Sequence, residues 1–116
     1  MRLIIAIIQP TKLNALRAAL LHIGVERMTV CDAQGYGQQL GHTAVYRGVE
    51  YKTNLLRKIA IEVAVNDDFL DRTIATIENV ARTGTEGNIG DGKIFVLPLE
   101  HVIRIGGMAT GPEAVN

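Results

Sequence analysis

The fold is decided by residues 59–81, which read IAIEVAVNDDFLDRTIATIENVA. Over residues 59–65, isoleucine and valine alternate with alanine and glutamate, and this period of two predicts a strand with one buried face. Residues 66–68 are Asn-Asp-Asp, whose side-chain oxygens are suited to the N-cap of a helix. The helix that follows has an apolar stripe made of Leu70, Ile74, Ile77 and Ala81. This segment therefore predicts a strand that leads directly into an amphipathic helix.

The N-terminal part of the chain contains a second unit of the same kind. Residues 3–8 form an apolar run that predicts a strand buried on both faces, and Pro10 breaks it. Residues 13–23 then place apolar side chains on one helical face, and Gly24 is placed to end that helix in a left-handed conformation. Further strands are predicted over residues 27–36, 93–97 and 101–105.

The predicted order is strand, helix, strand, long loop, strand, helix, strand. Two such halves make an α+β, ferredoxin-like βαββαβ antiparallel sheet with both helices on one face. We expect a single domain over residues 1–116, with a flexible C-terminal tail over about 106–116. The second face of the sheet needs a cover, and a closed ring of copies is one solution.

The composition excludes several classes of protein. Hydrophobic residues make up 47% and charged residues 21% of the 116 residues, which is ordinary for a globular domain. Twelve basic side chains balance twelve acidic ones, so no net field favours nucleic acid or an anionic membrane. The lone Cys31 cannot form an intrachain disulfide. The apolar N-terminal run is too short to span a bilayer, so we expect a cytoplasmic protein without direct membrane insertion.

One predicted loop is far too long for a simple connection. Residues 37–55 show neither the helical nor the strand period, whereas hairpin loops usually have about two to five residues. The segment includes Tyr46 and Tyr51 and has little Pro or Ser. We therefore interpret it as a regulatory element that recognises a partner.

A second loop, over residues 82–93, is rich in glycine and ends with Lys93. Glycines let backbone N–H groups converge on an anion, and the lysine adds positive charge. Residues 87–93 match most of the phosphate-loop pattern G-x-x-x-x-G-K, but the segment runs from helix into strand, and Ile94 stands where Ser or Thr is needed. A P-loop NTPase is therefore disfavoured, while a plain flexible connector remains an alternative interpretation of the loop.

Three stretches together resemble the PII nitrogen-regulatory family: YRGVEY at 46–51, GDGKIFV at 90–96 and GVERMTV at 24–30. The resemblance extends from about Arg2 to Ile105. It implies a homotrimeric signalling protein, without dedicated catalytic activity, that holds ATP, ADP or AMP in each cleft between subunits. It also implies Mg²⁺ and the effector 2-oxoglutarate. The implied partners are an ammonium transporter or another membrane transporter, enzymes of nitrogen metabolism and a uridylyltransferase, but not nucleic acid.

The same resemblance implies roles for individual residues. Gln39 would help to coordinate Mg²⁺ with ATP and 2-oxoglutarate, and Lys58 would pair with a carboxylate of 2-oxoglutarate. Tyr51 matches a tyrosine that is uridylylated in some members, and Arg47 matches an arginine that enters a transporter. The nucleotide would be held by residues from two strands, the Gly-rich loop and the C-terminal segment, namely Thr29, Gly35, Gly37, Gln38, Glu62, Ala64, Gly90, Asp91, Gly92, Lys93 and Arg104.

The sequence departs from the family pattern at the phosphate end of this site. The Gly-rich loop is longer than usual, Thr85 and Glu86 stand where a basic residue is common, and Gly106 replaces an arginine. Because a charge-assisted contact contributes about 1.5–3 kcal/mol, these losses predict weaker nucleotide binding or a preference for ADP or AMP. Two alternatives remain at this point: a divergent sensor that regulates a metal-efflux or bicarbonate transporter, and a small ATP-dependent enzyme built around residues 87–93.

Overall fold

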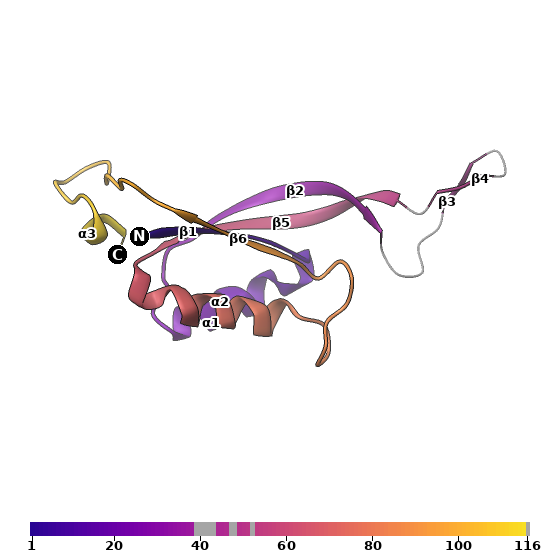
Figure 1. The fold of residues 1–116 in the computed structure, drawn as a ribbon, viewed down its shortest axis with the longest axis horizontal. Helices are drawn as coiled ribbons and strands as arrows, with labels where there is room; N and C mark the ends of the chain where they lie inside the picture. Colours follow the sequence, from indigo (N-terminus) through magenta and orange to yellow (C-terminus); the bar gives the residue numbers. More distant parts are fainter. Residues whose placement is uncertain (39–43, 47–48, 52, 116) are drawn as a thin grey trace.

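The computed structural model describes residues 1–38, 44–46, 49–51 and 53–115. Within these ranges the main sheet has four antiparallel strands in the order β2-β5-β1-β6. Two helices cover one face of this sheet (Figure 1). The bounds are β1 (Arg2–Ile8), α1 (Leu13–His22), β2 (Thr29–Gln38), β5 (Thr53–Val65), α2 (Asp67–Ala81) and β6 (Gly92–Pro98), and a short 3₁₀ turn, η1 (Pro10–Lys12), precedes α1. The predicted ferredoxin-like α+β architecture is confirmed.

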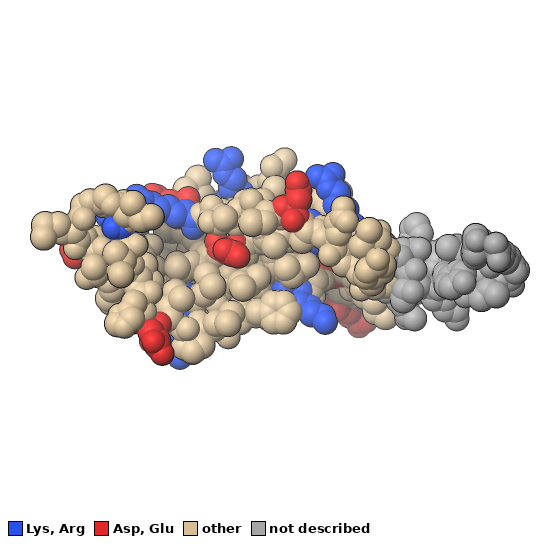
Figure 2. Space-filling model, turned by 90° about the horizontal axis from the view of Figure 1, so that it is seen from above, with Lys and Arg blue, Asp and Glu red and all other residues tan. Residues whose placement is uncertain are grey.

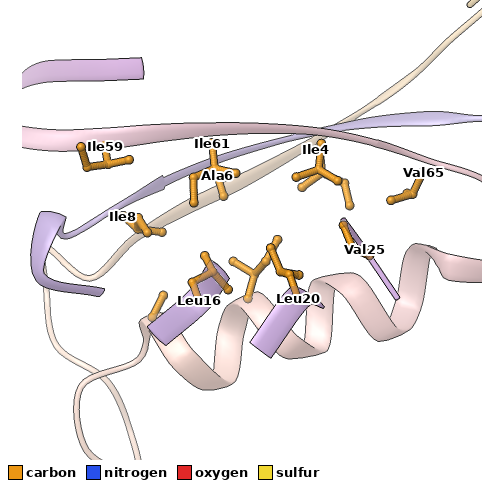
Figure 3. Close-up of a cluster of buried hydrophobic side chains, with 12 residues drawn as sticks. Ile4, Ala6, Ile8, Leu16, Leu20, Val25, Ile59, Ile61 and Val65 are labelled. Atoms are coloured by element: carbon orange, nitrogen blue, oxygen red, sulfur yellow. The ribbon is translucent and has the colours of Figure 1, made fainter. Parts of the chain in front are cut away.

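The helix-facing side of the sheet holds the core, as the period of two predicted. In the register of β1 with β5, Ile4 faces Val63 and Ala6 faces Ile61, and all four side chains are buried. Leu16 and Leu20 of α1 pack against them from the helical layer (Figure 3). These aliphatic contacts join both strand–helix units into one hydrophobic cluster.

Within the part of the chain that the structure describes, no layer covers the opposite face of the sheet. The register places Ile5 of β1 between Glu62 of β5 and Phe95 of β6, all on this open face. Phe95 is 49% exposed, and Leu97, one step further along the same face, is 42% exposed. Seen from the side opposite the helices, the surface is mostly uncharged, with acidic and basic side chains interspersed (Figure 2). An open apolar face of this kind favours self-association.

β2 and β5 form a long hairpin that extends beyond the other strands (Figure 1). Their pairing continues to Gln38 opposite Thr53, so it enters the segment that the sequence predicted as loop. Two further short strands, β3 (Ala44–Tyr46) and β4 (Val49–Tyr51), pair with each other near the end of this hairpin. Backbone pairing needs no alternation of apolar side chains, which is why the residue pattern did not show these strands.

The ends of the two helices differ in how well the sequence predicted them. Gly24 adopts a φ of 94°, and its N–H and that of Val25 donate to carbonyls of the last turn of α1, as expected for a left-handed glycine cap. At α2, Asn66 occupies the N-cap position, but its side chain does not cap the helix. Its amide donates instead to the Pro112 carbonyl oxygen at 3.1 Å, so the predicted role of Asn66 was wrong.

The predicted strand over residues 101–105 was also wrong. Ile103 makes only an isolated bridge with Thr110, because the chain reverses between them at Gly106 and Gly107, both with positive φ. This turn is followed by a short helix, α3 (Pro112–Val115). Among the described residues, no helix is long and apolar enough to cross a membrane.

The helical core contact can be tested with two adjacent leucines of α1. Leu20 is fully buried, whereas Leu21 is 58% exposed. We expect Leu20→Ala to lower the free energy of unfolding by about 2–5 kcal/mol through lost burial and the cavity left behind. Leu21→Ala should change it by less than about 0.5 kcal/mol. Urea denaturation at one fixed protein concentration measures both, and equal losses would contradict this account of the core.

Candidate functional site

The Gly-rich loop between α2 and β6 is closed by one carboxylate. Asp91 Oδ2 accepts the backbone N–H groups of Thr83 at 2.8 Å and Asn88 at 2.9 Å, and Oδ1 accepts the Thr83 hydroxyl. The hydroxyl of Thr83, followed by these backbone N–H groups, holds the pKa of the Asp91 carboxyl below its usual value. The ionised carboxylate therefore ties the start, middle and end of the loop together.

The glycines at the end of this loop are required by backbone geometry. Gly90 and Gly92 have φ values of 98° and 131°, which side chains of L-residues rarely allow. A Cβ built on Gly92 would lie 1.8 Å from the carbonyl oxygen of Ile7, because β6 begins directly against β1. No larger residue fits at Gly92 unless the two strands separate.

A lysine from β5, an inner strand of the sheet, reaches this loop. Lys58 lies on β5 opposite Ala33, one position beyond the end of the pairing between β1 and β5. Its half-buried ammonium donates a hydrogen bond to the carbonyl oxygen of Gly90. The loop therefore crosses the end of β1 and is attached to β5.

Two pockets lie at opposite ends of the sheet. One, of about 510 Å³, lies beneath the Gly-rich loop, and its lining includes Asp91, Gly92 and Lys93. The other, of about 300 Å³, includes Ala64 and Phe69. β1 runs from one pocket towards the other. At one end Arg2 lies opposite Val65 and Pro98, and at the other end Ile8 lies opposite Gly92.

The structure divides the predicted nucleotide-binding residues between these two ends. Thr29 pairs with Glu62 level with the middle of β1, Ala64 lies two positions closer to the end nearest α3, and Arg104 follows β6 at that end. At the far end of the sheet lie Gly35, Gly37, Gln38, Lys58, Gly90, Asp91, Gly92 and Lys93. β6 alone separates Gly92 from Pro98 by about 20 Å. One chain therefore does not bring Arg104 to the Gly-rich loop.

Some predicted residues cannot be placed. Gln39, predicted for Mg²⁺ and 2-oxoglutarate, and Arg47, predicted to contact a transporter, lie outside the described residues. For Gln38 and Tyr51 the structure describes the strand but not the side chain. The roles of these four residues stay predictions.

Sequence reasoning missed the residues that shape the loop. Thr83 and Asn88 were not singled out, although an Asn three residues before an Asp in a Gly-rich segment is a typical turn signal. The contact between Lys58 and Gly90 had no local signal, because the two residues lie 32 positions apart.

The fold and this loop define a class: a ferredoxin-like α+β protein with a Gly-rich, lysine-bearing loop at one end of an open-faced sheet. Comparison with known families is decisive for the rest, because the family described as "Nitrogen regulatory protein P-II" matches residues 1–107. The chain belongs to this family.

Individual relatives agree with this assignment. The chain is 52% identical over 115 residues to the nitrogen regulatory protein GlnK1 of Methanosarcina mazei, covering 99% of this chain and 97% of that protein. It is 45% identical to the nitrogen regulatory protein P-II of Rhizobium etli, over 99% of this chain and all of that protein. It is 49% identical to GlnK of Escherichia coli strain K12, covering 90% and 91% of the two chains.

The family resemblance seen in the sequence is thus confirmed, and with it a role as a nitrogen-regulatory signalling protein. The family consists of regulators and not of enzymes, which confirms the prediction that the protein has no dedicated catalytic activity. Membership of this family therefore argues against the alternative of a small ATP-dependent enzyme. The names of these relatives also favour nitrogen regulation over metal-efflux or bicarbonate systems.

The role of Asp91 predicts a pH dependence of the loop. Because the folded pKa lies below the unfolded value of about 3.9, the carboxylate stabilises the closed loop above that pH, and this contribution is lost as pH falls through the lowered pKa. We expect the amide NMR signals of Thr83 and Asn88 to titrate together below about pH 4. Asp91→Asn should abolish this titration. Titration at the usual pKa of an exposed aspartate would contradict the closure of the loop by Asp91.

Proposed function

We propose that this nitrogen-regulatory protein binds an adenine nucleotide between copies of the chain and thereby controls the segment over residues 37–55. The observation that carries the proposal is the division of the predicted nucleotide residues between opposite ends of one sheet. Each end also has its own pocket, one including Ala64 and the other Lys93. A nucleotide that uses both sets needs one end from each of two copies.

A ring satisfies this requirement for every copy at once. When one end of a chain contacts the other end of the next chain, the contact is heterologous and closes only as a ring. The open face of the sheet, where Phe95 and Leu97 are about half exposed, supplies apolar surface for such an assembly. A trimer, as the family resemblance implies, would have as many nucleotide clefts as subunits.

The chemistry at the two ends suits different parts of a nucleotide. At the Gly-rich loop, Lys58 and Lys93 supply positive charge beside the left-handed backbone of Gly90, which fits phosphate groups. In the same cleft, the other copy would contribute Thr29, Glu62 and Ala64, which would face the base and ribose. Its Arg104 would reach the phosphates held by the Gly-rich loop. Gly106, in place of an arginine, favours ADP or AMP over ATP.

The long hairpin would report the ligand state to a partner. Lys58 would bind a carboxylate of 2-oxoglutarate at the base of this hairpin, with Gln39 and Mg²⁺ completing the site. A ligand shifts the hairpin only by its difference in affinity between conformations, typically 1–3 kcal/mol. The proposed partners are a membrane transporter, reached by Arg47, and enzymes of nitrogen metabolism in the cytoplasm. Uridylylation of Tyr51 would add a negative phosphodiester and oppose docking.

Nucleotide binding is the direct test. Calorimetric titration with ATP, ADP and AMP, each with and without Mg²⁺ and 2-oxoglutarate, should show saturable binding, with 2-oxoglutarate strengthening the binding of Mg²⁺-ATP. Weaker binding of ATP than of ADP would support the altered phosphate end. Absence of binding by any of the three nucleotides would overturn the proposed function.

The shared cleft can be tested by mixing variants. Lys93→Met and Arg104→Gln should each weaken binding by about tenfold, because each removes a charge-assisted contact. When both variants are co-expressed in equal amounts and assemble at random, about one quarter of all clefts combine two unaltered ends. Titration of the mixture should therefore recover a minor class of tight sites. No recovery would mean that both residues serve a site within one chain.

A further inference from the structure

The chain turns back on itself near its C-terminus. The Arg104 N–H donates to the Ala109 carbonyl oxygen, and the Gly111 N–H donates to that of Val102. A small hairpin results, and α3 follows it at the end of the sheet where β5 passes into α2 (Figure 1). We call residues 109–115 the strap.

Two side chains bind the backbone of the strap. The Asn66 amide donates to the Pro112 carbonyl oxygen at 3.1 Å, and Arg104 Nη2 donates to the Glu113 carbonyl oxygen at 3.3 Å. All four residues of α3 are described, and none of them is buried. Hydrogen bonds to its backbone, and not deep burial, therefore fix the position of the strap.

Asn66 serves the strap and not its own helix. It occupies the N-cap position of α2, where an asparagine side chain usually accepts a backbone N–H of the first turn. No such bond is present in α2, which is described over its whole length. The side-chain amide donates instead to a carbonyl 46 positions away. The start of α2 is thus linked to the C-terminal segment.

The strap joins two parts of the proposed nucleotide site. Val115 lines the pocket of about 300 Å³ that also includes Ala64. Arg104, whose guanidinium would reach the phosphates, is bound by the carbonyl of Glu113, two residues before Val115. An exposed arginine loses rotamer freedom when it binds a phosphate, and a contact that already orders the side chain lowers this cost.

We propose that Asn66 is a positioning residue for nucleotide binding: it anchors the strap, and the strap holds the Arg104 guanidinium in place for the phosphates. This inference rests on the proposed function and deepens it, since Asn66 itself would touch no nucleotide. The strap also lies almost wholly outside residues 1–107, the part of the chain that the family matches, by residues 109–115. Its contacts form within a single chain and therefore do not depend on the assembly.

The test replaces Asn66 by residues that can still cap α2. Aspartate and serine are about as favourable at an N-cap as asparagine, but neither has the amide group that reaches Pro112. Asn66→Asp and Asn66→Ser should therefore release the strap without weakening the helix. Asn79→Asp is the matched control, because it makes the same change of charge at an exposed position of the same helix.

The first readout is amide hydrogen exchange of Gly111 and Ala114, whose N–H groups donate to carbonyls within the C-terminal segment. We expect exchange to rise by about fivefold in both Asn66 variants, the change that follows from losing one hydrogen bond. It should stay near the wild-type rate in Asn79→Asp. Wild-type exchange in Asn66→Ser, or an equal rise in Asn79→Asp, would overturn the proposed anchor.

The second readout is the affinity for ADP, measured by calorimetry. Asn66→Ser should weaken it by about three- to fivefold, and Arg104→Gln by about tenfold. In a protein with both substitutions the loss should equal that of Arg104→Gln alone, because the strap acts through this arginine. Losses that multiply would show that Asn66 acts by another route and would contradict the proposal.

Two outcomes separate this inference from the proposed function. Unchanged ADP affinity in Asn66→Ser, in a protein whose wild type binds ADP, would refute the positioning role alone. Absence of nucleotide binding by the wild type would overturn the proposed function and the positioning role together. Amide exchange would then still decide whether Asn66 anchors the strap.

Discussion

The register of β1 between β5 and β6 is the constraint on which the rest of the structure depends. Ile4, Ala6 and Ile8 face the helices, while Ile5 lies on the open face opposite Glu62 and Phe95. A shift of one residue would exchange these faces and expose the core. The same register brings Gly92 against the Ile7 carbonyl and thus sets where the Gly-rich loop ends. Core and candidate site therefore depend on one set of backbone pairs.

The site itself is a loop whose shape is determined largely by contacts within the chain. The Asp91 carboxylate joins Thr83 to Asn88, and Lys58 attaches Gly90 to the strand that continues into the long hairpin. A loop ordered in this way loses less conformational entropy when it binds an anion.

Prediction from sequence succeeded where a pattern reports burial or a special backbone. The alternation over residues 59–65, the stripe of α2 and the glycine after α1 were confirmed, because each reflects local geometry. It failed at Asn66, whose amide binds the Pro112 carbonyl, and at the strand predicted over residues 101–105. In both cases a partner from the C-terminal segment decided the outcome, and periodicity carries no information about such partners.

By itself, the sequence determined the two strand–helix units, the glycine positions of the loop and the motifs by which the chain joins the P-II family. Only the tertiary structure showed that the predicted nucleotide residues lie at opposite ends of one sheet, and that Lys58 holds Gly90. The reason is that helical and strand periods follow from neighbouring residues. The distance between Lys93 and Arg104, by contrast, depends on the order and length of the strands in the folded sheet, which neighbouring residues do not reveal.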